Sequence, residues 1–464
     1  MRFPRGGGDS PPLRERDGWM RKGYDVTGGR ELFVDDLLID HVRNAGLKPH
    51  FPVELPCAPG KPCGDYLTIL KDPERYLLYF RGTDGVYRGE MYNNHPGEFV
   101  GVARSSDGVG WELPALDRFP GRPVPRNALL YGPGAVTHNF VPFYDTSPAC
   151  PPEFRYKAVA GVRETGGLFA FHSPDGIGWE RYGDSPVIPY EPGKTGGHML
   201  DSQNTVFYSE AEKCYVMYFR VWKTADGLTD VRSFAKVTSP DFLHWSEPEF
   251  LTVNLKNEHL YVSGLAPYFR APQFYVGAAT RYFGDRGSAT DVTFLFSRGG
   301  RGILRPFPGA WIRPGLEEER WRNRMNYIAL GMVRKDEREL LLYHGRKELM
   351  YKFRTDGFVS LSSTGTGTGS VLTKLLFRRG GGLELNLSTS AGGFFQLAVC
   401  DGEGKAIPGY GFGECPPYWG DRISWEPEWK GRKFAELPPG GFRLRIRMKE
   451  CDLYSIGFPA ARAK

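Results

Sequence analysis

The chain has 464 residues, of which 40% are hydrophobic and 25% are charged, and its formal net charge is +6. This is an ordinary globular composition without a block of Lys and Arg, so nucleic-acid binding is not expected. No stretch approaches the roughly 18 apolar residues of a membrane-spanning helix. The aromatic content of 14%, with 60 Gly and 37 Pro, favours short strands joined by frequent turns.

The first residues are polar and rich in Gly and Pro, so we expect residues 1–29 to be a flexible lead-in. They contain no apolar run of the kind found in secretory signals. This predicts a cytoplasmic protein, or an exported one if the sequence is a mature or partial form. The seven Cys residues are scattered, with no CxxC pair and no His at zinc-finger spacing. We therefore expect free thiols and no cofactor. No spacing of ligand residues indicates a metal site, and whether a metal binds at the centre of the fold stays open.

A short motif occurs three times: "SSDGVGWE" from Ser105, "SPDGIGWE" from Ser173 and "SPDFLHWS" from Ser239. In each copy a Trp stands four positions after an Asp. Asp side chains accept hydrogen bonds from backbone N–H groups in tight turns. The Trp then begins the returning strand and packs between layers. Each copy therefore predicts a hairpin.

Three short apolar strands precede each of these turns, and the motif recurs after about 66 residues. A repeat of four-stranded units is typical of a β-propeller. Two weaker copies lie within 263–297 and 326–354, the last ending in a turn at Asp356 and Gly357. The prediction is five blades within residues 30–363. The strand "LFVDDLLID" (32–40) is expected to complete the ring or to pack beneath it.

Residues 362–370, "SSTGTGTGS", read as a linker. The alternating strands that follow lack the blade turn and predict a β-sandwich accessory domain over 371–460, with a sixth blade as the alternative. The predicted fold class is therefore all-β, a five-bladed β-propeller followed by a C-terminal β-sandwich.

The innermost strands of a propeller surround a central axis, so polar residues at their starts should converge on one pocket. Every predicted blade has charged, amide or hydroxyl side chains at that place. They are Asp65 in the first blade, His138 and Asn139 in the second, His198, Asp201, Ser202 and Gln203 in the third, Glu258, His259 and Tyr261 in the fourth, and Arg322, Arg324 and Asn326 in the fifth.

Each of these residues also has a structural interpretation. Asp65 and Asp201 are also suited to turns, Glu258 to a solvated loop, and His138 to a structural hydrogen bond. Asp72 is better explained as a hairpin-turn residue. Arg81 and Arg220, which each end a "YFR" strand, are expected to pack between blades or to brace the acids.

Two or three carboxylates around one pocket suit glycoside hydrolysis. One acid protonates the leaving oxygen, and the other activates water or attacks the anomeric carbon. We expect Asp65, Asp201 and Glu258 to be the catalytic residues of a glycosidase acting on an oligosaccharide or glycoside. The expected substrate-binding residues are His138, Asn139, His198, Gln203, His259, Tyr261 and Arg324, with Tyr66, Tyr261 and Trp321 stacking on sugar faces.

The chain resembles the five-bladed β-propeller glycoside hydrolases of families 32, 43, 68 and 117. The resemblance rests on the repeated strand units with S-x-D-G-x-x-W turns, on the acids at inner strands and on the C-terminal sandwich. It is closest to uncharacterised bacterial relatives of family 32, through "FVDDLLID", "HMLDSQNTVFY" and "MKECDLYSIGF". It implies Asp65 as nucleophile or base, Asp201 as a second acid and Glu258 as proton donor. The implied substrate is a furanoside or an unusual anhydro- or deoxy-sugar.

The sequence departs from the family pattern in the second blade, where His138 and Asn139 replace an acid, and it lacks the Asn-Asp-Pro-Asn segment of family 32. Three alternatives therefore stay open. They are a glycoside phosphorylase with Arg322, Arg324 and His138 holding phosphate, a non-catalytic carbohydrate-binding propeller, and a structural scaffold. A sialidase is less favoured, because its Asp-box has one more residue between Asp and Trp and its propeller has six blades. The oligomeric state is not predicted.

Overall fold

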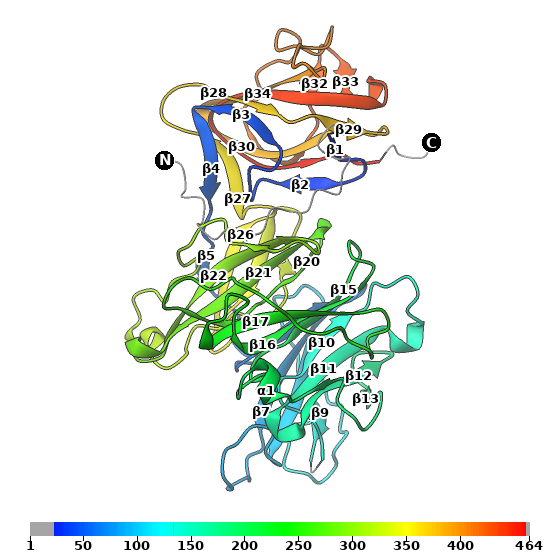
Figure 1. The fold of residues 1–464 in the computed structure, drawn as a ribbon, viewed down its shortest axis with the longest axis vertical. Coiled ribbons are helices and arrows are strands. Elements are labelled where there is room, and N and C mark those ends of the chain that lie inside the picture. The colour runs from blue at the N-terminus through cyan, green and yellow to red at the C-terminus, as the bar shows by residue number, and fades with distance from the viewer. Residues whose placement is uncertain (1–22, 133, 461–464) are drawn as a thin grey trace. The chain divides into compact units, whose positions relative to one another are not determined.

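The computed structural model describes residues 23–132 and 134–460, and these are nearly all in β-strands and turns (Figure 1). Two compact units divide the chain: Phe51–Thr355, and the described parts of Met1–His50 with Asp356–Lys464. Within the described ranges no helix has the length and apolarity to cross a membrane. The seven cysteines all fall in these ranges and are free.

The unit Phe51–Thr355 is the predicted five-bladed β-propeller, which the structure confirms. Each blade is an antiparallel sheet, and in blades I to IV the strands follow one another in chain order. Blade I contains β6 (Thr68–Lys71), β7 (Tyr76–Thr83), β8 (Glu98–Ser105) and β9 (Ala128–Tyr131). Blade II contains β10 (Val141–Tyr144), β11 (Tyr156–Val162), β12 (Gly167–Ser173) and β13 (Glu180–Arg181), with β14 (Ile188–Pro189) also on β12.

Blade III contains β15 (Thr205–Ser209), β16 (Cys214–Lys223), β17 (Thr229–Ser239) and β18 (Glu249–Phe250). Blade IV contains β19 (His259–Val262), β21 (Ala271–Phe283), β22 (Ala289–Arg298) and β23 (Ile303–Leu304), with β20 (Ala266–Tyr268) on β21. Short helical segments lie between strands: α1 (Pro192–Thr195), η1 (Pro152–Phe154), η2 (Arg163–Thr165), η3 (Gly284–Arg286) and η4 (Glu318–Trp321).

Blade V closes the ring with a strand from the start of the unit. It contains β24 (Val333–Arg334), β25 (Glu339–Tyr343) and β26 (Leu349–Arg354), and β5 (Val53–Pro56) pairs with β26. Buried Arg320 donates hydrogen bonds to Glu54 and to the Tyr351 hydroxyl, each at 2.6 Å. The expectation that residues 32–40 complete the ring is therefore wrong. The closing strand is the short segment "VELP", which has too few residues to show a periodic pattern.

The blades pack face to face, so their middle strands are apolar on both faces. All seven residues of β11 are buried. Side chains of blades I and II share one core around Tyr79, Phe140 and Trp179, and those of blades II and III share another around Phe143 and Phe242. This two-sided burial explains why the middle strands read as continuous apolar runs.

The repeated Ser-x-Asp motifs form the predicted turns. Asp107 Oδ1 accepts hydrogen bonds from the N–H groups of Val109 (2.8 Å) and Gly110 (3.0 Å), and the Ser105 hydroxyl bonds the same oxygen. The same bonds recur at Asp175 and Asp241. The carboxylates of these aspartates are used to close turns within single blades, so they are not candidates for chemistry.

The second unit is built on two long strands, β30 (Glu384–Cys400) and β34 (Gly440–Gly457). Their neighbours are β1 (Tyr24–Asp25), β2 (Arg30–Leu32), β3 (Ile39–Arg43), β4 (Ala45–Pro49), β27 (Val359–Ser363), β28 (Gly369–Thr373), β29 (Leu376–Arg378) and β31 (Asp421–Trp425). A hairpin of β32 (Glu428–Trp429) and β33 (Arg432–Lys433) and the helix η5 (Phe434–Glu436) complete it. These strands enclose one apolar core that includes Phe395 and Trp429. The sheet of ten strands rules out the alternative of a sixth blade.

The boundaries differ from those expected at 30–363 and 371–460. Strands β2, β3 and β4 belong to the sandwich sheet, although they come before the propeller in the chain. The segment 362–370 joins β27 to β28 within that sheet, so it is a loop and not a linker. Asp356 is also part of this unit, where it pairs with Arg30 at 3.6 Å. Of the predicted lead-in 1–29, residues 1–22 lie outside the described ranges.

Candidate active site

At least one non-glycine residue with left-handed backbone geometry lies in the segment before the first strand of every blade. These residues include Tyr66 (φ 56°), Asn139 (57°), Leu200 (68°), Asn257 (61°) and Arg324 (59°). For Tyr, Leu and Arg this geometry costs about 1–3 kcal/mol, and such strain concentrates at functional sites. The first strands of blades I, II and III contact one another, so these five loops lead into the strands around the axis.

Three tyrosines from different blades meet at the axis. Tyr66 of blade I is stacked on Tyr261 of blade IV with 6.5 Å between ring centroids. Tyr327 of blade V packs edge-on against both, at 5.5 and 5.6 Å. They form an aromatic floor of the kind on which a sugar ring can stack.

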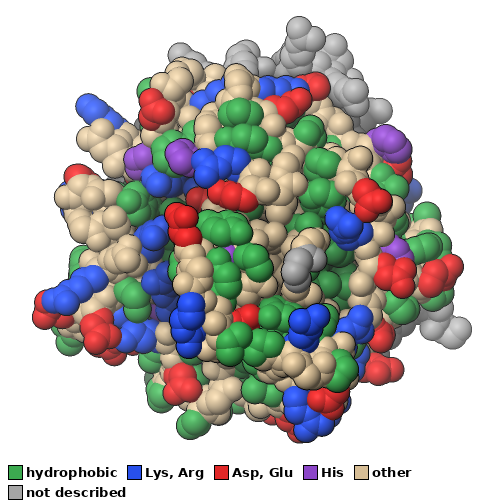
Figure 2. Space-filling view, turned by 90° about the horizontal axis from the view of Figure 1, so that it is seen from below, with side chains coloured by type: hydrophobic (Ala, Val, Ile, Leu, Met, Phe, Trp, Pro, Cys, Tyr) green, Lys and Arg blue, Asp and Glu red, His purple; other side chains and the backbone are tan. Residues whose placement is uncertain are grey.

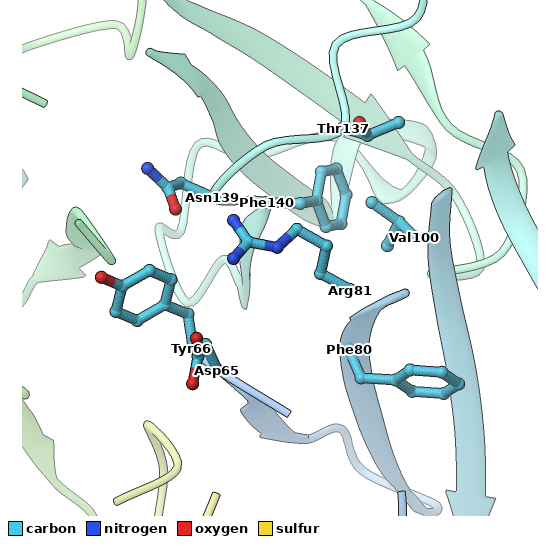
Figure 3. Close-up of a pocket in the computed structure, with 8 residues that line it drawn as sticks. All are labelled: Asp65, Tyr66, Phe80, Arg81, Val100, Thr137, Asn139 and Phe140. Atoms are coloured by element: carbon cyan, nitrogen blue, oxygen red, sulfur yellow. The ribbon is translucent and has the colours of Figure 1, made fainter. Parts of the chain in front are cut away.

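A small pocket of about 10 Å³ lies beside this floor, roughly the space that one water molecule occupies. It is lined by residues of blades I and II, among them Asp65, Tyr66, Arg81 and Asn139 (Figure 3). The Arg81 guanidinium points between the Tyr66 ring and the Asn139 amide in this view. Its Cζ lies 5.7 Å from the Tyr66 ring centroid.

Asp65 is held in this pocket by an ion pair. Arg346 of blade V donates from Nε and Nη2 to its two carboxylate oxygens, the second bond being 2.7 Å. The side chain of Asp65 is 25% exposed, so the carboxylate is oriented but still reachable from solvent. It lies where the sequence prediction placed it, at the entry to the first strand of blade I.

His138 is buried between two charged groups of blade I. Its Nδ1 lies 2.9 Å from Glu98 Oε2, and its ring nitrogens lie 2.9 Å from Arg81 Nη1. Burial alone would raise the pKa of Glu98, but the hydrogen bond and charge of His138, with Arg81, lower it below its usual value. His138 thus fixes Arg81, and Arg81 faces the pocket.

Asp201 has an unusual environment for a half-buried carboxylate. Within the described ranges no side chain or backbone N–H lies within hydrogen-bond or ion-pair distance of it. Its charge still acts on the pKa values of Tyr66, Tyr261 and Arg232, so it lies beside the aromatic floor. A turn-capping role, the structural interpretation of this residue, would require backbone N–H donors that are absent here.

Tyr261 has a perturbed phenol. Burial would raise the pKa of Tyr261, but the Arg220 guanidinium, 4.0 Å from its ring, and hydrogen bonds from Tyr66 and Arg324 lower it overall. Arg324 Nη1 lies 3.3 Å from the Tyr261 hydroxyl. Two predicted binding residues, Tyr261 and Arg324, therefore meet at the floor.

Gln203 and Ser202 brace the site through hydrogen bonds to other blades. The Gln203 amide donates to the Leu67 carbonyl at 3.0 Å and to Thr68 Oγ1 at 2.9 Å, which ties blade III to blade I. Ser202 donates to the Tyr261 carbonyl at 2.6 Å. Asn139 donates to the Leu200 carbonyl at 3.1 Å, but its buried Oδ1 has no partner in the described part of the chain.

Glu258 lies apart from this cluster. It is buried, its carboxylate accepts a hydrogen bond from the Leu255 N–H at 2.9 Å, and Arg305 and Arg281 pair with it. An acid fixed in this way is a structural ion pair, so the structure does not support Glu258 as proton donor. Residues at equivalent strand entries can point their side chains in different directions, and the sequence pattern does not show which direction each one takes.

The remaining predicted residues lie at the edge of the site or outside it. His259 accepts a hydrogen bond from the Arg232 N–H at 3.1 Å, and exposed His198 lies 5.0 Å from the Trp222 ring. Arg322 pairs with Glu318 on the surface. Trp321 is 54% exposed, and its indole donates to the Gly315 carbonyl at 3.0 Å.

Sequence reasoning missed Glu98, Arg232 and Arg346. Glu98 and Arg232 are charged residues at or near the start of a buried strand, β8 and β17, and this position is the signal that could have found them. Arg346 follows β25 in a loop without a distinctive pattern. No group of three or more His, Cys, Asp or Glu suited to a metal ion occurs among residues 23–132 and 134–460.

Charges of both signs are interspersed with hydrophobic side chains on the face seen in Figure 2, without a large block of one sign.

Neither a scan against protein-family models nor a search of curated proteins finds a match. Solved structures with some similarity include a glycosyl hydrolase from Bacteroides ovatus (13% identity, 72% of this chain and 94% of that one, TM-score 0.40). Others are an alpha-L-arabinofuranosidase from Clostridium thermocellum (12%, 66% and 92%, 0.41) and a beta-1,2-mannobiose phosphorylase from Listeria innocua (11%, 70% and 96%, 0.43).

Proposed function

We propose that the protein is a glycoside-processing enzyme that hydrolyses a glycosidic bond at the propeller axis. The observation that carries this proposal is the half-buried Asp201 carboxylate, which has no partner among the described residues and lies beside an aromatic floor. Buried polar groups are normally satisfied, so Asp201 and the unpaired Asn139 Oδ1 fit a site that receives a hydroxyl-rich ligand.

Asp65 and Asp201 have complementary environments. Arg346 orients Asp65, which suits a group that must attack an anomeric carbon or activate water from a fixed direction. Asp201 is not held by the protein and is free to approach the leaving oxygen, which suits a proton donor. His138 acts through Arg81 as a positioning residue. Glu258 has no part in this assignment.

The test is sugar release from a panel of furanosides, pyranosides and plant or algal oligosaccharides, run with and without phosphate. Release without phosphate supports hydrolysis. Strict dependence on phosphate would instead support the phosphorylase alternative. A furanosidic, anhydro- or deoxy-sugar stays a prediction, and the panel tests it directly.

Substrates with different leaving groups distinguish the roles of Asp65 and Asp201. If Asp201 donates the proton, Asp201→Asn should lose roughly 10²–10⁴-fold in turnover of a sugar-leaving substrate. It should lose much less with a 4-nitrophenyl glycoside, whose leaving group needs no proton. Equal losses with both substrates would contradict this role.

A further inference from the structure

Arg232 on β17 lies in an aromatic cage, which we define as the rings of Trp222, Tyr261 and Tyr282. Its Cζ is 4.4, 5.4 and 4.6 Å from the three ring centroids. In the part of the chain that the structure describes, no side chain forms a hydrogen bond or ion pair with its guanidinium, whose Nε is enclosed and unpaired. A guanidinium has five N–H donors, and those of Arg232 have no side-chain acceptor among the described residues.

A second arginine adds positive charge at the same place. Arg220 is 1% exposed and stacks on Tyr261 at 4.0 Å. Its Nη2 donates to the Tyr261 carbonyl, while its Nε and Nη1 have no partner among the described residues. Burial first, and then repulsion from Arg220, lower the pKa of Arg232 below its usual value. Two like charges held together in this way are costly unless an anion neutralises them.

The nearby acids do not supply that anion. Asp65 pairs with Arg346, Glu98 with His138 and Arg81, and Glu258 with Arg305. Asp201 is close enough to influence Arg232, but it forms no ion pair with it. The arginines Arg220, Arg232 and Arg324 therefore outnumber the one uncommitted carboxylate at the floor.

We propose that the enzyme acts on an anionic sugar of the uronic acid class, whose carboxylate binds Arg232 in its aromatic cage. This inference rests on the proposed function and narrows its substrate. The singly charged carboxylate fits better than phosphate, because the charge of Asp201 repels a dianion more strongly. A planar carboxylate also matches the guanidinium fork, and the rings exclude water from the contact.

The test measures binding by calorimetry to the full chain carrying Asp201→Asn, with D-glucuronate, D-galacturonate, D-glucose, D-galactose and inorganic phosphate as probes. We expect at least one uronate to bind roughly tenfold or more tightly than its neutral counterpart. Arg232→Gln should weaken uronate binding about 10- to 100-fold and leave neutral sugars unchanged. Arg232→Lys should retain part of the preference, and Arg286→Gln, at an exposed arginine of blade IV, should retain all of it.

Equal binding of uronates and neutral sugars would overturn the proposal, as would uronate binding that Arg232→Gln does not change. Phosphate and uronate binding are also compared in wild type, which keeps the Asp201 charge. Phosphate binding there that is tighter than uronate binding and lost in Arg232→Gln would also overturn the proposal, because the anion would then be free phosphate. The two proposals fail separately. Wild type that releases only neutral sugars contradicts the anionic substrate and not the hydrolysis, whereas Arg232-dependent uronate binding without any turnover contradicts the hydrolysis alone.

Discussion

Replacing Asp201 by Asn should separate activity from stability. The carboxylate has no hydrogen-bond or ion-pair partner among the described residues, so folding does not depend on it. We expect the free energy of unfolding to change by no more than about 0.5 kcal/mol, as for surface substitutions. Loss of a general acid should lower turnover roughly 10²–10⁴-fold, which corresponds to about 3–5 kcal/mol in the activation barrier.

The assay pairs sugar release with urea unfolding of wild type, Asp201→Asn and a control, Asp184→Asn. Asp184 is a carboxylate of similar chemistry whose side chain is 97% exposed on blade II. The control should match wild type in both measurements. An Asp201→Asn protein that is destabilised by about 2 kcal/mol would show that Asp201 has a structural partner, and turnover within threefold of wild type would remove Asp201 from the chemistry.

Three further outcomes are expected. Gln203→Ala removes the bonds to blade I and leaves the buried Thr68 hydroxyl without its donor, although the Leu67 carbonyl keeps its bond from the Leu330 N–H. It should cost about 1–3 kcal/mol in urea unfolding, and an unchanged midpoint would contradict its bracing role. The pKa of Asp241 is lowered: burial opposes this, but the His244 N–H and side chain outweigh it. Its stabilisation is therefore present above about pH 4 and lost as the pH falls further, so Asp241→Asn should flatten the decline of wild-type stability below pH 4. A chain of residues 1–363 keeps β2 and β3 without their partners β34 and β28, so it should aggregate in size-exclusion chromatography. Residues 51–355 keep all five blades and should be monodisperse, and a soluble 1–363 monomer would contradict this reasoning.

Local patterns in the sequence determined the blades. The motifs at Asp107, Asp175 and Asp241 are turns whose hydrogen bonds stay within a few residues of the aspartate, so their chemistry can be read from neighbouring letters. The continuous apolar strands before each motif indicate sheets that are buried on both faces. These local features were sufficient for the number of blades and for the positions at which their first strands begin.

Long-range pairing decided the rest. β5 closes the ring by pairing with β26, almost 300 residues later in the chain, and β2 to β4 join the sandwich sheet for the same reason. The pattern of four or five residues in such a short strand does not indicate which distant strand it pairs with.

The site shows the same division between sequence and structure. The sequence placed Asp65, Asp201 and Glu258 at equivalent strand entries, but the partners of a carboxylate come from distant loops. Arg346 orients Asp65 and Arg305 fixes Glu258, while Asp201 has no partner among the described residues. Whether an acid is available for chemistry therefore depends on charges that only the tertiary structure brings beside it.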